Sequence, residues 1–368
     1  PQTFQTPGFI MLTHAIFFAL GLVTLIVGAE LLVRGASKLA LSTGISPLVV
    51  GLTVVAFGTS APEMAVSVGA SLGGNPDLAI GNVVGSNIAN ILLILGISAL
   101  VAPLIVHEQI IRQEVPIMIG ACVIFVAMAL DGDVSRTEAG VLFALVIGYT
   151  VFLIRQSRSA SRELTDEYAA EMPADSNWDR HWSVQLGLVV VGLGGLILGA
   201  DWLVDSAVAF ARAFGVSDLV IGLTVVAIGT SMPEIATSIV AALRGERDIA
   251  VGNVVGSNVF NVFAVIGVTG LVSSGGIPVP EAARNFDLWV MLAVAFAALP
   301  IMLTGREISR WEGGIFIGYY GAYTAYLILA AQDHAILPAY SGVMLGYVLP
   351  LTVVTLIVSM MRHNGRAA

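Results

Sequence analysis

The chain has 368 residues, of which 57 % are apolar and only 11 % are charged, and its mean hydropathy is +0.91. Because soluble domains carry about 25 % charged residues, this composition excludes a soluble globular protein and indicates an all-α polytopic membrane protein. The single cysteine, Cys122, excludes a disulfide framework and a cysteine-based metal site. We expect no nucleic-acid partner, and the net charge of −9 does not bear on this point because the charges are confined to loops.

The apolar runs predict eleven membrane spans, since one span needs about 20 apolar residues. The first five cover about 12–36, 46–72, 78–100, 115–130 and 139–154. The next five cover about 183–208, 217–243, 249–272, 286–303 and 311–331, and an eleventh covers about 337–361. We therefore divide the chain into a five-helix repeat (1–154), a cytoplasmic linker (155–182), a second five-helix repeat (183–331) and an extra C-terminal helix with a tail (332–368).

An internal duplication supports this division. The stretch GLTVVAFGTSAPEMAVS at Gly51–Ser67 returns as GLTVVAIGTSMPEIATS at Gly222–Ser238, with 13 of 17 positions identical at an offset of 171 residues. The same offset carries GNVVGSN from 81–87 onto 252–258. The strongest similarity covers about 28–100 and 199–271, so the two halves are homologous.

The basic residues predict how the chain lies in the membrane. With the N-terminus outside and the C-terminus in the cytoplasm, 13 of the 16 Lys and Arg residues lie in cytoplasmic segments, as the positive-inside rule requires. Five spans per half then place the second repeat upside down relative to the first. Such inverted repeats are common in alternating-access transporters.

Each half carries one glutamate, Glu63 or Glu234, inside an apolar segment, and such an acid is by default a functional hypothesis. Each follows Gly-Thr-Ser-x-Pro, and glycine and proline together predict that the helix breaks at 58–62 and 229–233. Backbone carbonyls freed at membrane depth are tolerated beside a cavity or its ligand. Carboxylates, hydroxyls and carbonyls form an all-oxygen site that suits Ca²⁺ or Na⁺. The alternative is a kinked helix whose glutamate pairs with a buried partner.

Polar residues near each glutamate extend this predicted site. Helical spacing puts Thr59 on the face of Glu63, and Ser86 on the face of Asn90. The inverted two-fold would bring both copies of the set together: Thr59, Ser60, Glu63, Ser86 and Asn90 with Thr230, Ser231, Glu234, Ser257 and Asn261. The alternative for each hydroxyl is a hydrogen bond to its own helix.

Both GTSxPE motifs, each followed by GNVVGSNxxN, resemble the two alpha-repeats of the cation/Ca²⁺ exchanger superfamily, and in particular its prokaryotic Na⁺/Ca²⁺ exchanger branch. The resemblance implies ten core helices in a prokaryotic inner (plasma) membrane. It also implies one midplane site for which Ca²⁺ and Na⁺ compete, with the first and sixth spans sliding as a gate. It assigns Ca²⁺ to Glu63, Glu234 and the backbone oxygens of Thr59 and Thr230. It assigns Na⁺ to Ala56, Ser60, Ser86, Asn90, Ala227, Ser231, Ser257 and Asn261.

One departure from the family bears on coupling. Many exchangers have Asp where this chain has Asn261, so the stoichiometry and any part played by H⁺ or K⁺ stay open. We expect a secondary antiporter that exchanges Ca²⁺ for Na⁺, with no resident cofactor and an undetermined oligomeric state. The alternatives are Ca²⁺/H⁺ exchange on the same scaffold and a passive cation channel. An intramembrane protease is disfavoured because no nucleophile–base pair accompanies the two acids.

Two further features have competing interpretations. Glu30 and Asp201 occupy equivalent positions near the ends of the first and sixth spans. They would close a gate, attract cations or simply be solvated at a helix end. The glycine-rich run at 192–195 has no strand before it, and we interpret it as close helix packing.

Overall fold

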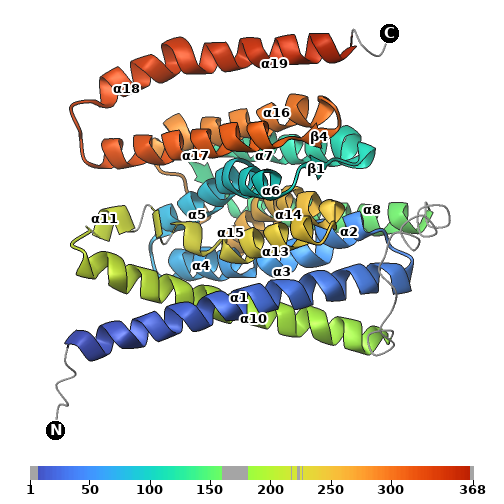
Figure 1. The fold of residues 1–368 in the computed structure, drawn as a ribbon. Helices are drawn as coiled ribbons and strands as arrows, with labels where there is room; N and C mark the ends of the chain where they lie inside the picture. Colours follow the sequence, from blue (N-terminus) through green and yellow to red (C-terminus); the bar gives the residue numbers. More distant parts are fainter. Residues whose placement is uncertain (1–6, 160–180, 217, 222–223, 226, 365–368) are drawn as a thin grey trace.

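The structure is a computed structural model that describes residues 7–159, 181–216, 218–221, 224–225 and 227–364. It is almost entirely helical (Figure 1). The first half contains helices and π-helical turns in this order: α1 (Pro7–Thr43), α2 (Pro47–Val50), η1 (Gly51–Val55), α3 (Ala56–Thr59), α4 (Ala61–Leu72), α5 (Pro76–Ala89), η2 (Asn90–Leu95), α6 (Gly96–Val101), η3 (Ile110–Glu114), α7 (Val115–Ala129) and α8 (Arg136–Ser159).

The second half repeats this order, and a further helical segment follows it. The repeated elements are α10 (Trp182–Ala213), α11 (Asp218–Ile221), α12 (Ala227–Gly229), α13 (Met232–Leu243), α14 (Arg247–Phe260), η6 (Asn261–Ile266), α15 (Gly267–Val272), η7 (Ala283–Asp287), α16 (Leu288–Leu303) and α17 (Arg310–Ala331). The additional elements are α18 (Leu337–Val343), η8 (Met344–Val348) and α19 (Leu349–Asn364).

The predicted all-α polytopic membrane protein is confirmed. Among the described residues, nine helices are long and apolar enough to span a membrane, and the bent pair Pro47–Thr59 and Ala61–Leu72 makes a tenth. In the predicted span 217–243 the described residues contain one apolar helix, Met232–Leu243, which is too short to span a membrane alone. Residues 217, 222–223 and 226 of this span lie outside the described part. The total of eleven therefore stays a prediction.

The linker differs in one respect from the prediction. Helix α8 continues beyond the predicted end of the fifth span at residue 154 and ends at Ser159. Residues 160–180 of the predicted linker lie outside the described residues.

Helices α1 and α10 pack along each other, at the bottom of the view in Figure 1. A Cβ atom added to Gly28 would lie 2.9 Å from the carbonyl oxygen of Gly192, and one added to Gly192 would lie 2.8 Å from that of Gly28. The pair Gly21 and Gly199 repeats this contact at 2.9 and 2.8 Å. Small residues that admit such close backbone approach are typical of membrane helix packing, so the predicted role of the run at 192–195 is confirmed.

These contacts also reveal a pseudo-two-fold relation between the halves. The offset of 171 residues relates Gly21 to Gly192 and Gly28 to Gly199. In the contact the pairs are exchanged, because Gly28 meets the counterpart of Gly21 and Gly21 meets the counterpart of Gly28. The short strands are exchanged in the same way: β1 (Leu104–Ile105) pairs antiparallel with β4 (Glu307–Ile308), and β2 (Asp133–Val134) pairs with β3 (Ile277–Pro278). The halves are therefore interlocked rather than arranged as separate domains.

Both predicted helix breaks are present. Helix α3 ends at Thr59 and α4 begins at Ala61, and the junction residue Ser60 has φ −80° and ψ 5°. In the second half Ser231 precedes α13 with φ −87° and ψ 7°. A proline in the first turn of each following helix lacks an N–H group, which the first turn leaves without an intrahelical partner in any case.

Candidate functional site

Glu63 and Glu234 lie in the first turns of α4 and α13, and each residue is only 1 % exposed. Each carboxylate accepts a hydrogen bond from a serine of the other repeat. The Ser231 hydroxyl donates to Glu63 Oε1 at 3.1 Å, and the Ser60 hydroxyl donates to Glu234 Oε1 at 3.3 Å. Because the repeat offset exchanges these two bonds, both acids belong to one site at the pseudo-two-fold axis.

Two asparagines fix the broken segments around this site. The Thr59 hydroxyl donates to Asn253 Oδ1 at 3.1 Å, and the Thr230 hydroxyl donates to Asn82 Oδ1 at 3.3 Å. Each asparagine amide nitrogen donates to a serine on the broken helix of its own repeat, at 2.9 and 3.0 Å. The Asn82 amide also donates to the carbonyl oxygen of Glu63 at 3.1 Å. Each asparagine thus ties the broken helix of one half to that of the other.

A second amide network lies one turn further along α5 and α14. The Asn90 amide donates to Asn258 Oδ1 at 2.9 Å, and the Asn261 amide donates to Asn87 Oδ1 at 3.1 Å. Asn90 and Asn261 are the first residues of the π-helical turns η2 and η6. Such turns occur frequently at functional sites, and here the same irregularity occurs in both repeats.

Among the residues that the structure describes, several buried oxygens of the predicted site residues have no hydrogen-bond partner. They are Glu63 Oε2, Glu234 Oε2, Asn90 Oδ1, Asn261 Oδ1 and Ser257 Oγ. Buried polar groups are nearly always satisfied, so the unpaired oxygens of both carboxylates, together with those of both asparagines in the neighbouring amide network, indicate that something else binds there. Carboxylate, amide and hydroxyl oxygens are the ligands of hard cations.

The carboxylates have no basic partner that would neutralise them. Within the described residues, neither Glu63 nor Glu234 forms an ion pair with Lys, Arg or His, and their side-chain partners are hydroxyls. Ser60 and Ser231 likewise bond across the repeats and not to their own helices. The simpler interpretation, a kinked helix with a paired acid, therefore does not describe this site.

The predicted residues come together, with differences in detail. Ser86 contacts Ser231, with 3.3 Å between the hydroxyl oxygens, and so joins the cluster. Among the described residues, no backbone hydrogen bond across the break reaches the carbonyl oxygens of Thr59 or Thr230. By contrast, the carbonyl oxygen of Ala56 accepts the N–H of Ser60 at 3.0 Å. Ala227 opens α12, and its side chain lies outside the described part.

The sequence reasoning missed four asparagines: Asn82, Asn87, Asn253 and Asn258. A signal for them was present, because all four belong to the repeated GNVVGSN segment. Their partners in the other repeat were not predictable, since each of these hydrogen bonds joins residues about 148 to 194 positions apart in the chain. Only the interlocking of the halves brings these residues into contact.

The two equivalent acids at the ends of the first and sixth spans differ in their surroundings. The Arg244 guanidinium binds the Glu30 carboxylate with two contacts, Nη2–Oε1 at 2.6 Å and Nε–Oε2 at 3.0 Å. The repeat offset relates Arg244 to Gly73, so the first half offers Asp201 no equivalent arginine. The ion pair therefore joins α1 to the end of α13 on one side of the molecule only.

Comparison with known proteins agrees with this geometry. The profile of the family described as "Sodium/calcium exchanger protein" matches residues 13–155 and 184–329. The chain belongs to this family. The two matched segments are the two five-helix halves, so the resemblance inferred from the GTSxPE motifs is confirmed.

Individual relatives of this exchanger-family chain cover most of its length. It is 39 % identical over 295 residues to the inner membrane protein YrbG of Escherichia coli, a match that covers 78 % of this chain and 89 % of YrbG. It is 34 % identical to the sodium/calcium exchanger MaX1 of Methanosarcina acetivorans, covering 84 % of this chain and 96 % of MaX1. The solved sodium-calcium exchanger NCX_Mj, soaked with zero Na⁺ and Ca²⁺, superimposes with a TM-score of 0.73 at 30 % identity, covering 86 % of this chain and 99 % of that one.

Proposed function

We propose that this chain is a secondary antiporter that exchanges Ca²⁺ for Na⁺ at the site between Glu63 and Glu234. One observation carries the proposal: two buried carboxylates without a basic partner, each with an unpaired oxygen, face the same two-fold axis. An uncompensated buried charge is very costly. A cation bound between the two acids would remove that cost.

In this proposal Ca²⁺ takes one oxygen from each carboxylate together with the carbonyl oxygens of Thr59 and Thr230. Na⁺ uses the flanking hydroxyls and amides, among which Ser257, Asn90 and Asn261 carry unpaired oxygens. Asn82 and Asn253 position the broken segments without binding the ion. The two negative charges balance one Ca²⁺ or two Na⁺, and a third Na⁺ would leave the loaded site at +1, so the charge count allows either an electroneutral or an electrogenic cycle.

Alternating access would arise from movement of α1 and α10 past the site. In this structure α1 packs along α13, whereas its counterpart α10 makes no comparable contact with α4 within the described residues. The molecule is therefore closed more tightly on the side of Arg244 and Glu30. With the orientation predicted from the basic residues, that side is the cytoplasm, and the ions would enter from outside.

The test is uptake of ⁴⁵Ca²⁺ into proteoliposomes loaded with Na⁺, compared with an imposed H⁺ gradient and an imposed K⁺ gradient. We expect uptake that requires internal Na⁺ and saturates with external Ca²⁺. Uptake that follows the proton gradient and ignores Na⁺ would replace this proposal by Ca²⁺/H⁺ exchange. Flux without counter-transport would indicate a channel.

A further inference from the structure

The segment formed by α18, η8 and α19 has no counterpart in the first half and stands apart from the helices below it, at the top of Figure 1. No residue of α18 or η8 is buried. Two side-chain hydrogen bonds connect this segment to α17. The Tyr340 hydroxyl donates to the carbonyl oxygen of Ala322 at 2.8 Å, and the Tyr319 and Thr352 hydroxyls bond to each other.

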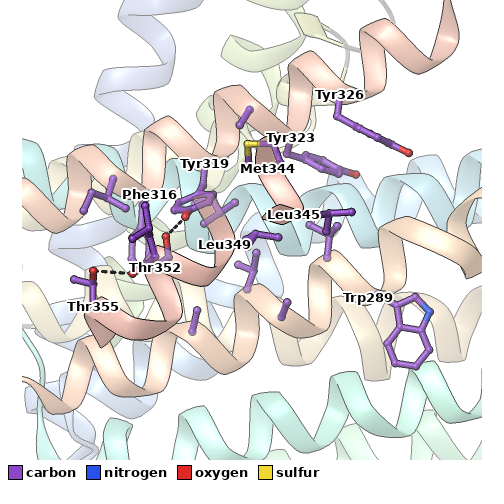
Figure 2. Close-up of a pocket in the computed structure, with 18 of the residues that line it drawn as sticks. Trp289, Phe316, Tyr319, Tyr323, Tyr326, Met344, Leu345, Leu349, Thr352 and Thr355 are labelled. Carbon is purple, nitrogen blue, oxygen red and sulfur yellow. Dashed lines mark hydrogen bonds between the residues drawn. The ribbon is translucent and has the colours of Figure 1, made fainter. Parts of the chain in front are cut away.

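A cavity of about 770 Å³ lies between this segment and helices α16 and α17 (Figure 2). Trp289 and Tyr326 line one end of the cavity, and Thr304 and Trp311 line the other. Fifteen residues of helix separate Trp289 from Thr304, or about 22 Å at the rise of an α-helix. The cavity therefore extends along most of the roughly 30 Å thickness of a bilayer's hydrocarbon core.

The walls between these ends are apolar. Ala293 and Ala297 of α16, Phe316 of α17, and Leu345 and Leu349 of the C-terminal segment line them. Water would find few hydrogen-bond partners there, and cavities lined by such side chains stay dry. A groove of this size between packed helices leaves apolar side chains without packing partners, which is uncommon in close-packed proteins. Tryptophan and tyrosine at the ends match the aromatic belts found at the two membrane interfaces, which places the cavity at hydrocarbon depth.

We propose that this groove binds an acyl chain of a membrane phospholipid, which fills the space between the exchanger core and the C-terminal helix. The lipid would then be a structural ligand that seats the extra helix. The first half provides the comparison: α8, the counterpart of α17, exposes Val141, Ile147 and Phe152, and no additional helix of the described residues covers them. Lipid on that face is exchangeable bilayer, whereas lipid in the groove is enclosed on three sides by protein.

The test is native mass spectrometry of the full chain after delipidation in mild detergent, with and without added phosphatidylethanolamine and phosphatidylglycerol. The wild type should retain or rebind one phospholipid, and its melting temperature should rise with added lipid. Ala297→Trp and Ala322→Trp fill the groove from opposite walls, and both should lose the bound lipid and the rise. Ala144→Trp, an equal change on the exposed face of α8, should behave like the wild type.

Two results would overturn the proposal. If the delipidated wild type binds no phospholipid, the proposal is wrong whatever the variants do. Equal binding and equal thermal stabilisation in the wild type and in a monodisperse groove variant would show that the lipid binds elsewhere. If the wild type is a dimer that Ala297→Trp or Ala322→Trp dissociates with no change in bound lipid, a second copy of the chain covers the groove instead.

Discussion

Glu63→Gln and Glu234→Gln should each abolish tight Ca²⁺ binding while leaving the protein folded. Glutamine keeps the shape of the side chain and still accepts the serine hydrogen bond of 3.1 or 3.3 Å. It removes one charge, and it replaces one carboxylate oxygen by an amide nitrogen that cannot bind a cation. Because the two acids have equivalent surroundings, we expect the two variants to lose binding to a similar extent.

The magnitude follows from the burial of the site. Both acids are 1 % exposed, and removing one partner of a buried charge pair costs about 3–5 kcal/mol. At about 1.4 kcal/mol per factor of ten, the dissociation constant for Ca²⁺ should rise roughly a hundredfold to a few thousandfold. Without ions the variants should be no less stable than the wild type, because the substitution removes one of two like charges that are buried together.

The assay measures Ca²⁺ binding by calorimetry and the Ca²⁺-dependent rise in melting temperature. Glu108→Gln is the matched control, since Glu108 is half-exposed and forms ion pairs with Arg112 at 2.7 Å and Arg306 at 3.2 Å, away from the site. It should bind Ca²⁺ like the wild type. A dissociation constant within tenfold of the wild-type value for either site variant would refute the assignment of that carboxylate as a ligand. A strong effect of one variant alone would refute the two-fold equivalence of the acids.

Further substitutions test other parts of the molecule. Asn261→Asp gives the site a third acidic group, and we expect Na⁺-driven Ca²⁺ uptake to change its dependence on Na⁺ and pH; superimposable profiles would show that residue 261 does not face the ion. Glu30→Gln breaks the one-sided ion pair with Arg244, and an exposed pair contributes at most about 1 kcal/mol. The apparent Na⁺ affinities on the two sides of oriented proteoliposomes should therefore shift by no more than about fivefold, and a larger shift would mean that Glu30 acts directly on the ions. Deletion of 338–368 should leave measurable exchange, because no acid lies between 337 and 361 and the segment lies outside the repeats; a well-folded truncation without exchange would contradict this.

The sequence predicted the helical membrane fold and the position of both helix breaks. It did so because the determinants are local: apolar runs of a span's length, and a glycine and a proline on either side of Ser60 and Ser231. The acids were predictable for the same reason, since a carboxylate in an apolar segment is conspicuous and its duplication by a fixed offset more so.

The partners of these residues were not predictable, since they are set by how the halves interlock. The π-helical turns that begin at Asn90 and Asn261 leave no mark on hydrophobic periodicity. The asparagine cross-links depend on contacts between segments far apart in the chain. The difference between Glu30 and Asp201 arises from Arg244, which the second half has and the first half lacks. The sequence alone does not show which acidic residue this arginine binds.

The exchange of serines between the two carboxylates has a consequence for how such a protein arose. Each half contains an acid whose hydroxyl partner belongs to the other half, so neither half could form a complete site alone. A chain of half this length would need a second copy inserted in the opposite direction through the bilayer. Fusion of two such genes then fixes one copy in each direction. The two halves can afterwards differ in sequence, as they do at Arg244, which has no arginine counterpart in the first half.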